Sequence, residues 1–117
     1  MKVLIVDDNT TVRKLLRQML GDLVEHWSEC SDGDEVLDCY RARQPDWVLM
    51  DIAMQRLDGI EATRWLKAAF PEARIVIVTS YNDAALRAAA QAAGACGYVL
   101  KEDLLELRRL LQPAASG

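Results

Sequence analysis

Short apolar runs alternate with helix-forming segments along the whole chain, and this alternation limits the folds available to it. The apolar runs are Val3–Val6, Trp47–Met50, Ile75–Val78 and Tyr98–Leu100, with a weaker and more polar run at Val24–Cys30. Short runs rich in β-branched residues and bounded by polar turn residues are typical of parallel strands buried on both faces. In the intervening segments, apolar residues recur at helical spacing. Strands that alternate with helices predict a parallel sheet with helices on both faces.

We therefore predict an α/β fold built on a doubly wound, five-stranded parallel sheet. Because crossovers between parallel strands are right-handed, few arrangements of the strands remain. In the flavodoxin-like order 2-1-3-4-5, the first and third strands lie side by side at the switch point, where such sheets bind ligands. We assign residues 1–111 to one domain and residues 112–117, which are small and include Pro and Gly, to a tail or the start of a linker.

The net charge and the lengths of the apolar runs exclude several classes of function. With 117 residues, the chain has the ordinary size of one domain. Its net charge is -4 and it has no basic run, whereas proteins that bind nucleic acid carry clustered basic residues. The apolar runs are far too short to span a membrane, and no signal segment opens the chain. We expect a cytoplasmic protein that binds neither nucleic acid nor membrane directly.

Polar residues stand directly after four of the apolar runs. Asp7 and Asp8 follow the first run and Asp51 follows the third, while Thr79 and Lys101 follow the last two. The carboxyl ends of parallel strands meet at one edge of the sheet, so we expect these side chains to lie close together. Three gathered carboxylates repel one another and need a cation. With a hydroxyl and an ammonium group beside them, they predict a site for a hard metal ion and a phosphoryl group.

Several motifs then stand in order along the chain. They are Asp7-Asp8-Asn9, Ser31-Asp32-Gly33, Pro45-Asp46 leading to Asp51, Met54 followed by Asp58-Gly59, Val78-Thr79-Ser80, and Gly94-Ala95 leading to Lys101. With these motifs, the chain resembles the receiver domain of two-component response regulators over essentially its whole length. Its stretch Gly97–Glu102 is most similar to receivers that precede a LuxR-type helix-turn-helix output domain. The tail would then start the linker to such a domain.

The resemblance implies a chemistry for the acidic residues. Asp51 would accept a phosphoryl group from the phosphohistidine of a sensor histidine kinase. Asp8 and Asp51 would each bind Mg²⁺ with one carboxylate oxygen, together with the backbone carbonyl of Ala53. Asp7 would act mostly through a bound water. The domain would thus be a signalling receiver rather than an enzyme, with only auxiliary phosphotransfer and self-dephosphorylation activity.

The resemblance also implies a switch. Lys101 would pair with one phosphoryl oxygen, and Thr79 would donate its hydroxyl to another. Thr79 would move toward the phosphoryl group and vacate space into which Tyr98 could turn, which would change the surface of the fourth helix, the last strand and the last helix. That surface would control an output domain, own or separate, that regulates transcription. The sequence leaves open whether phosphorylation also produces a homodimer.

Some residues near the site depart from the pattern of the family or vary within it. Gln55 stands where many receivers have proline, which should loosen the loop beside the metal. Ala53 and Tyr81 occupy the two variable positions that flank the site. We expect the bulky Tyr81 to crowd the water that attacks the phosphoaspartate and so to prolong the phosphorylated state. Thr79 could instead cap the following helix, but we expect Asn82-Asp83 to form the cap, with Asn82 better placed for it than Thr79.

Other functions compete with the phosphoacceptor. One alternative is a receiver-like module that acts by protein contact and is not controlled by phosphorylation. The intact set of Asp8, Asp51, Thr79 and Lys101 argues against it, because a site that performs no chemistry can lose charged residues whose mutual repulsion is unfavourable. A second is a phosphatase of the haloacid dehalogenase type, whose aspartate signature does not match Asp7–Thr11. Flavin binding is excluded because Asp7 and Asp8 would repel the flavin phosphate.

Overall fold

The computed structural model describes residues 1–54 and 57–112, and within them five strands alternate with five α-helices and one short 3-10 helix, η1. The order along the chain is β1 (Lys2–Val6), α1 (Thr10–Leu20), β2 (His26–Cys30), η1 (Gly33–Glu35), α2 (Val36–Arg43), β3 (Trp47–Met50), α3 (Gly59–Ala69), β4 (Ile75–Thr79), α4 (Ala84–Ala93), β5 (Gly97–Leu100) and α5 (Leu104–Leu111). Among the described residues, no helix combines the length and the apolar composition needed to cross a membrane. The predicted alternation of strands and helices is confirmed.

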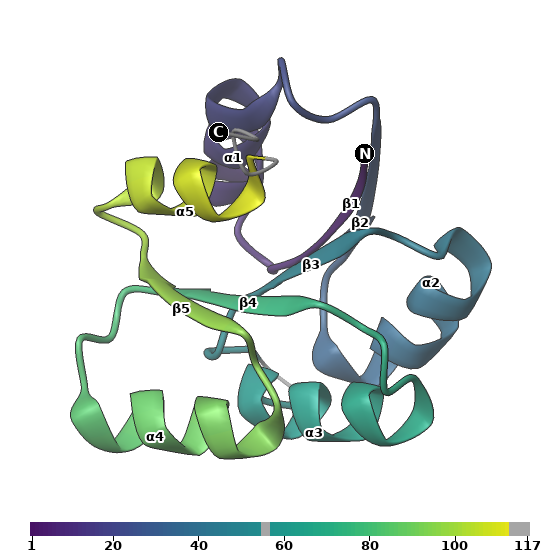
Figure 1. The fold of residues 1–117 in the computed structure, drawn as a ribbon, viewed down its shortest axis with the longest axis vertical. Coiled ribbons are helices and arrows are strands. Elements are labelled where there is room, and N and C mark those ends of the chain that lie inside the picture. Colours follow the sequence, from purple (N-terminus) through teal and green to yellow (C-terminus); the bar gives the residue numbers. More distant parts are fainter. Residues whose placement is uncertain (55–56, 113–117) are drawn as a thin grey trace, which may run out of the picture.

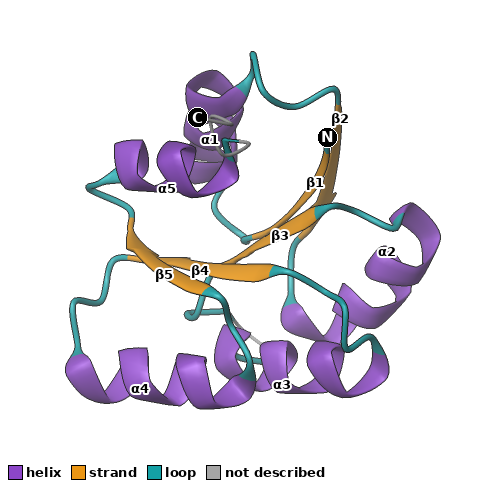
Figure 2. Cartoon of the chain, viewed as in Figure 1, coloured by secondary structure: helices purple, strands orange, loops and turns teal. Residues whose placement is uncertain are grey.

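All strand pairs in the sheet are parallel, and the strand order is β2-β1-β3-β4-β5. Helices α1 and α5 cover one face, whereas α2, α3 and α4 cover the other (Figure 1). The same view coloured by secondary structure shows the sheet as a single layer between the two groups of helices (Figure 2). The predicted α/β class and strand order 2-1-3-4-5 are thus confirmed.

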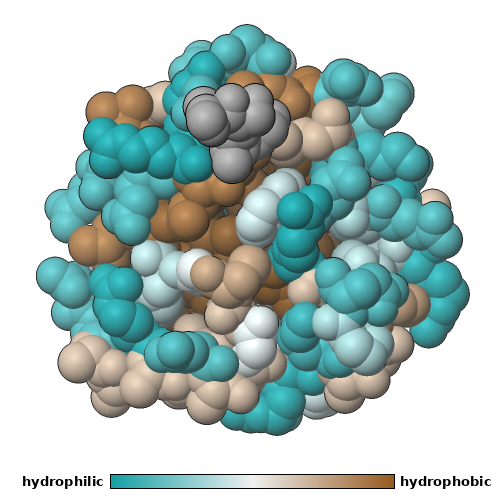
Figure 3. All heavy atoms as spheres, in the orientation of Figure 1, coloured by the Kyte–Doolittle hydropathy of each residue, from teal (hydrophilic) through white to brown (hydrophobic). Residues whose placement is uncertain are grey.

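Alternate residues of the central strands pack into two separate cores. In β1, Leu4 and Val6 belong to the core beneath α2, α3 and α4, whereas Val3 and Ile5 belong to the core beneath α1 and α5. All four are at most 1% exposed. Burying one such aliphatic side chain contributes about 1.5–3 kcal/mol, so β1 is anchored from both sides. Figure 3 shows hydrophilic residues around much of the rim of this view and hydrophobic residues gathered toward its centre.

Side-chain caps start the helices that follow β1, β3 and β4. The Oδ1 atom of Asn9 accepts hydrogen bonds from the first turn of α1, and Asp58 does the same for α3. Of the predicted Asn82-Asp83 cap of α4, the residue that caps the helix is Asp83 and not Asn82. Asp83 caps it, because Asp83 directly precedes the first helical residue and its Oδ1 lies 2.8 Å and 3.0 Å from the main-chain nitrogens of Ala85 and Leu86.

Candidate functional site

The sheet places Asp7 and Asp51 beside each other. Strands β1 and β3 are neighbours, with Val6 paired to Met50, so the residues that follow them leave the sheet at the same edge. The main-chain N–H of Asp51 donates to the carbonyl of Val6 at 2.9 Å, and the N–H of Asp7 donates to the carbonyl of Cys30 at 3.1 Å. Sheet hydrogen bonds therefore hold both backbones, which limits how far the two carboxylates can separate.

The structure brings the three predicted acidic residues together. One carboxylate oxygen from each of Asp7, Asp8 and Asp51 lies within 4.8 Å of the others. Asp7 and Asp51 are 2% and 5% exposed, whereas Asp8 faces solvent. The Oδ1 atom of Asp7 accepts the main-chain N–H of Asn9 at 2.8 Å, which orients that carboxylate. Clustered oxygen ligands of this kind, with one side open to water, suit a hard divalent cation such as Mg²⁺.

Lys101 links the two buried carboxylates. Its Nζ lies 3.2 Å from Oδ2 of Asp7 and 3.3 Å from Oδ1 of Asp51. The backbone of Lys101 is held by its N–H, which donates to the carbonyl of Thr79 at 2.8 Å. Burial by itself would lower the pKa of Lys101, but the charges of Asp7 and Asp51 outweigh it and raise that pKa above its ordinary value. Lys101 therefore remains a cation at the site.

The surroundings of Asp51 disfavour the charged form of its carboxyl group. Burial raises the pKa of its carboxyl above the ordinary value, and the nearby charge of Asp7 raises it further, while Lys101 opposes both effects. A buried carboxylate beside a neighbouring cation is suited to act as a nucleophile. The positive charge of Lys101, or of a bound metal ion, is what makes this charged form tolerable.

Gly59 and Asp32, which the sequence presents only within motifs, support the site. A Cβ atom on Gly59 would lie 1.8 Å from the carbonyl oxygen of Asp51, so any side chain there would push the backbone of Asp51 out of place. The buried Asp32 accepts the N–H of Leu57 with Oδ1 at 3.0 Å, which ties the loop after β3 to the loop after β2. Spacing gave no signal for either contact, since both depend on how separate loops pack.

Thr79, Tyr81 and Tyr98 are connected beside the site. Thr79 is fully buried, and its Oγ1 accepts the N–H of Tyr81 at 3.2 Å. The hydroxyl of Tyr98 donates to the carbonyl oxygen of Tyr81 at 2.6 Å, and Tyr98 is only 8% exposed. Tyr98 is thus already turned inward against the loop after β4. Because Oγ1 of Thr79 acts as acceptor toward Tyr81, its hydroxyl proton is available for another acceptor.

Of the two remaining predicted residues, the structure describes one. Ala53 is exposed two positions beyond Asp51, on the segment that leads to α3. Gln55 lies outside the described residues. Of the predicted site residues, the structure thus brings Asp7, Asp8, Asp51 and Lys101 together. Thr79 lies at the end of β4, next to β5, which leads to Lys101.

Comparisons with known proteins extend over nearly the whole of this fold. The family model of the response regulator receiver domain matches residues 3–112. The chemotaxis protein CheY of Halobacterium salinarum is 40% identical to the chain over 100 residues, which cover 86% of the chain and 83% of that protein. The uncharacterized transcriptional regulatory protein YhcZ of Bacillus subtilis is 38% identical over 116 residues, which cover 94% of the chain and 54% of that protein.

A solved structure shows the same likeness. The two-component response regulator of the LuxR family from Aurantimonas sp. superposes with a TM-score of 0.80 at 32% identity, and the match covers 94% of this chain and 84% of that one. The chain spans about half the length of YhcZ. The similarity thus extends over almost all of this chain, whereas YhcZ contains much that has no counterpart in it.

Proposed function

The chain belongs to the response regulator receiver domain family, and on that premise we propose that it is a phosphoacceptor of a two-component signalling system. In this proposal, Asp51 receives the phosphoryl group from the phosphohistidine of a sensor histidine kinase. The observation that carries the proposal is the position of the Lys101 ammonium group, 3.2–3.3 Å from both Asp7 and Asp51. Such a group can neutralise a carboxylate before transfer and a phosphoryl oxygen after it.

The transfer exchanges one bond to phosphorus for another. A carboxylate oxygen of Asp51 attacks the phosphorus atom, the P–N bond of the phosphohistidine breaks, and the imidazole nitrogen keeps the electron pair. The product is an acyl phosphate on Asp51. Lys101 then pairs with a phosphoryl oxygen as a flexible point charge, and Thr79 donates its free hydroxyl proton to another oxygen.

The donor set at the site fits Mg²⁺. Asp8 and Asp51 would each supply a carboxylate oxygen, and Ala53 its backbone carbonyl, while Asp7 would act through a water. When bound, the ion neutralises charge on the transferring phosphoryl group. Lys101 pairs with the carboxylates of Asp7 and Asp51. Gly59 permits the close packing that positions the backbone of Asp51.

The proposed readout is a change in the surface formed by α4, β5 and α5. A phosphoryl group brings close to two negative charges and three acceptor oxygens, so Thr79 is drawn toward it and the loop that carries Tyr81 follows. Tyr98 binds that loop and transmits the change. Residues 1–111 would form the receiver, and residues 112–117 would begin a linker to an output domain that regulates transcription in the cytoplasm. The likeness to transcriptional regulators supports this output.

Intact mass after incubation with Mg²⁺ and acetyl phosphate tests the proposal. We expect one added phosphoryl group in the parent protein and none in Asp51→Asn or without Mg²⁺. A protein that remains unmodified, under conditions that label another receiver, would instead favour a contact-only module that is not controlled by phosphorylation.

The lifetime of the phosphorylated state gives a second test. Tyr81 is 49% exposed, beside Thr79 at the rim of the site. If its side chain crowds the attacking water, Tyr81→Ala should lose the phosphoryl group several times faster than the parent does. The decay of the phosphorylated mass peak after removal of acetyl phosphate measures this rate. Equal decay rates would rule out a shielding role for Tyr81.

A further inference from the structure

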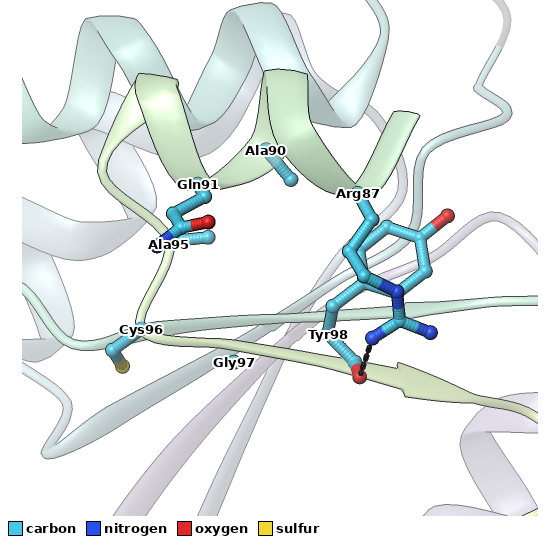
Figure 4. Close-up of a pocket in the computed structure, with 7 residues that line it drawn as sticks. All are labelled: Arg87, Ala90, Gln91, Ala95, Cys96, Gly97 and Tyr98. Carbon is cyan, nitrogen blue, oxygen red and sulfur yellow. Dashed lines mark hydrogen bonds between the residues drawn. The ribbon is translucent and has the colours of Figure 1, made fainter. Parts of the chain in front are cut away.

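Arg87 lies across the face of Tyr98. The Cζ atom of its guanidinium group is 4.5 Å from the centre of the Tyr98 ring. Its Nη1 also lies 3.4 Å from the main-chain carbonyl oxygen of Tyr98, a long hydrogen bond. Figure 4 shows the Arg87 side chain reaching down from α4 and running alongside the ring on β5. A single side chain on α4 therefore contacts both the ring and the backbone of the same tyrosine.

The far side of Tyr98 leads to the phosphoacceptor site. Its hydroxyl donates to the carbonyl of Tyr81 at 2.6 Å, and the N–H of Tyr81 donates to Oγ1 of Thr79 at 3.2 Å. Each link is a direct contact between neighbouring groups. Arg87 on the surface is thus connected through two tyrosines to the hydroxyl that we assign to the phosphoryl group.

Arg87 and Tyr98 both line a hollow between α4 and β5. The hollow between α4 and β5 is lined by small residues together with Gln91, as Figure 4 shows: Ala90, Ala95, Cys96 and Gly97. Of the residues that line this hollow, Arg87 makes a cation–π contact with the Tyr98 ring and a hydrogen bond to the Tyr98 backbone.

We propose that Arg87 is a positioning residue that holds Tyr98 turned inward before phosphorylation and thereby keeps the Thr79 hydroxyl ready to donate. A planar guanidinium group stacks on an aromatic ring and attracts its π-electrons, which a lysine ammonium does less well. A contact of this kind at the surface shifts an equilibrium between two ring positions by about threefold. The effect on phosphorylation rests on the proposed function, whereas the effect on the position of Tyr98 does not.

Tyrosine NMR of the unphosphorylated 117-residue chain tests the position of the ring. With ring-labelled tyrosine, the chain gives three tyrosine signals, and Tyr98→Phe identifies the one from Tyr98. In Arg87→Ala we expect the Tyr98 signal to move toward that of a solvent-exposed tyrosine, and in Arg87→Lys to move less. Gln91→Ala, which alters the same hollow without a contact to the ring, should leave the signal in place. An unmoved Tyr98 signal in Arg87→Ala would overturn the proposal.

The rate of phosphorylation tests the link to Thr79. With Mg²⁺ and acetyl phosphate, Arg87→Ala should become phosphorylated about threefold more slowly than the parent, and Gln91→Ala at the parental rate. A shifted Tyr98 signal with an unchanged rate would overturn the coupling to Thr79. If the parent itself takes no phosphoryl group, the proposed function fails, and the NMR result still decides whether Arg87 positions Tyr98.

Discussion

Two ion-paired groups in this protein contrast in geometry and in burial. At the surface, Arg108 binds Asp22 through two contacts, with its Nη1 2.7 Å from Oδ1 and its Nη2 2.5 Å from Oδ2. At the candidate site, the contacts of Lys101 are longer, at 3.2 Å and 3.3 Å. The pair with the shorter contacts is the more exposed one: the side chain of Asp22 is 65% exposed, whereas that of Asp51 is only 5% exposed.

The contrast shows that the shortest ion-pair distances do not identify the pair with the largest energetic effect. Water and salt screen the exposed pair of Arg108 and Asp22, so its two short contacts contribute little. Arg108 also donates to the carbonyl of Met19 at 2.9 Å, so its role is to dock α5 on α1. The buried carboxylates near Lys101 have lost most of their water, and removing their partner leaves that loss uncompensated.

The largest expected effect is on phosphorylation. Lys101→Met removes the ammonium group and keeps a side chain of similar length, so the rate with acetyl phosphate should fall by about 100-fold, as for the loss of one charge-stabilising donor. Arg108→Met is the matched control at the exposed pair and should retain the parental rate. Time courses of intact mass measure both rates. Similar losses in the two variants would break the contrast between buried and exposed pairs.

The next effect is on stability, and it should differ in sign between the two pairs. Because burial and Asp7 disfavour the charge of Asp51, Asp51→Asn in EDTA at pH 7 should raise the free energy of unfolding by about 1 kcal/mol. The Arg108 guanidinium lowers the pKa of Asp22, so Asp22→Asn should instead lower the stability slightly. Urea denaturation of both variants and the parent measures the two changes. A stability loss in Asp51→Asn would contradict the inferred charge crowding.

The smallest effect is a dependence on pH that follows from the same shift. The folded pKa of Asp51 lies above its ordinary value of 3.8. Between pH 3.8 and the folded pKa, the folded chain therefore holds a proton that the unfolded chain has released. The contribution of Asp51 to stability is therefore highest below pH 3.8 and declines as the pH rises through the folded pKa. Lys101, with its raised pKa, contributes at all pH values below 10.5 and loses this contribution only above it.

Urea midpoints of the parent and Asp51→Asn, recorded in EDTA from acidic to neutral pH, isolate the Asp51 contribution. We expect the stability gain of the variant to appear and grow as the pH rises from 3.8 toward neutrality. A gain that shrinks with rising pH would mean that Lys101 overcompensates the charge of Asp51.

Much of the site could be predicted because each of its residues directly follows an apolar run. A parallel sheet gathers the residues after its strands at one edge, so the sequence predicts that Asp7, Asp51 and Lys101 lie together, as the structure shows. Asp83 shows the limit of such patterns. Its role as the cap of α4 depends on the first helical residue, and the sequence offered Asn82 equally well.

The supporting contacts were not predictable in the same way. Gly59 matters because the carbonyl of Asp51 passes through the space that a side chain would occupy. Arg87 matters because α4 lies over β5 at the angle that brings its guanidinium onto Tyr98. Neither contact repeats along the chain, so no periodicity reports it.

The amino-acid sequence alone thus determined the strands, their order in the sheet and the cluster of acidic residues at one edge of it, because hydrophobic periodicity and right-handed crossovers leave few alternatives. The packed structure was needed to show that Lys101 stands between two carboxylates and that Tyr98 is already turned inward. These features depend on side-chain rotamers and on the paths of loops from different parts of the chain. Local patterns do not encode them, since their energies arise only when the layers come together.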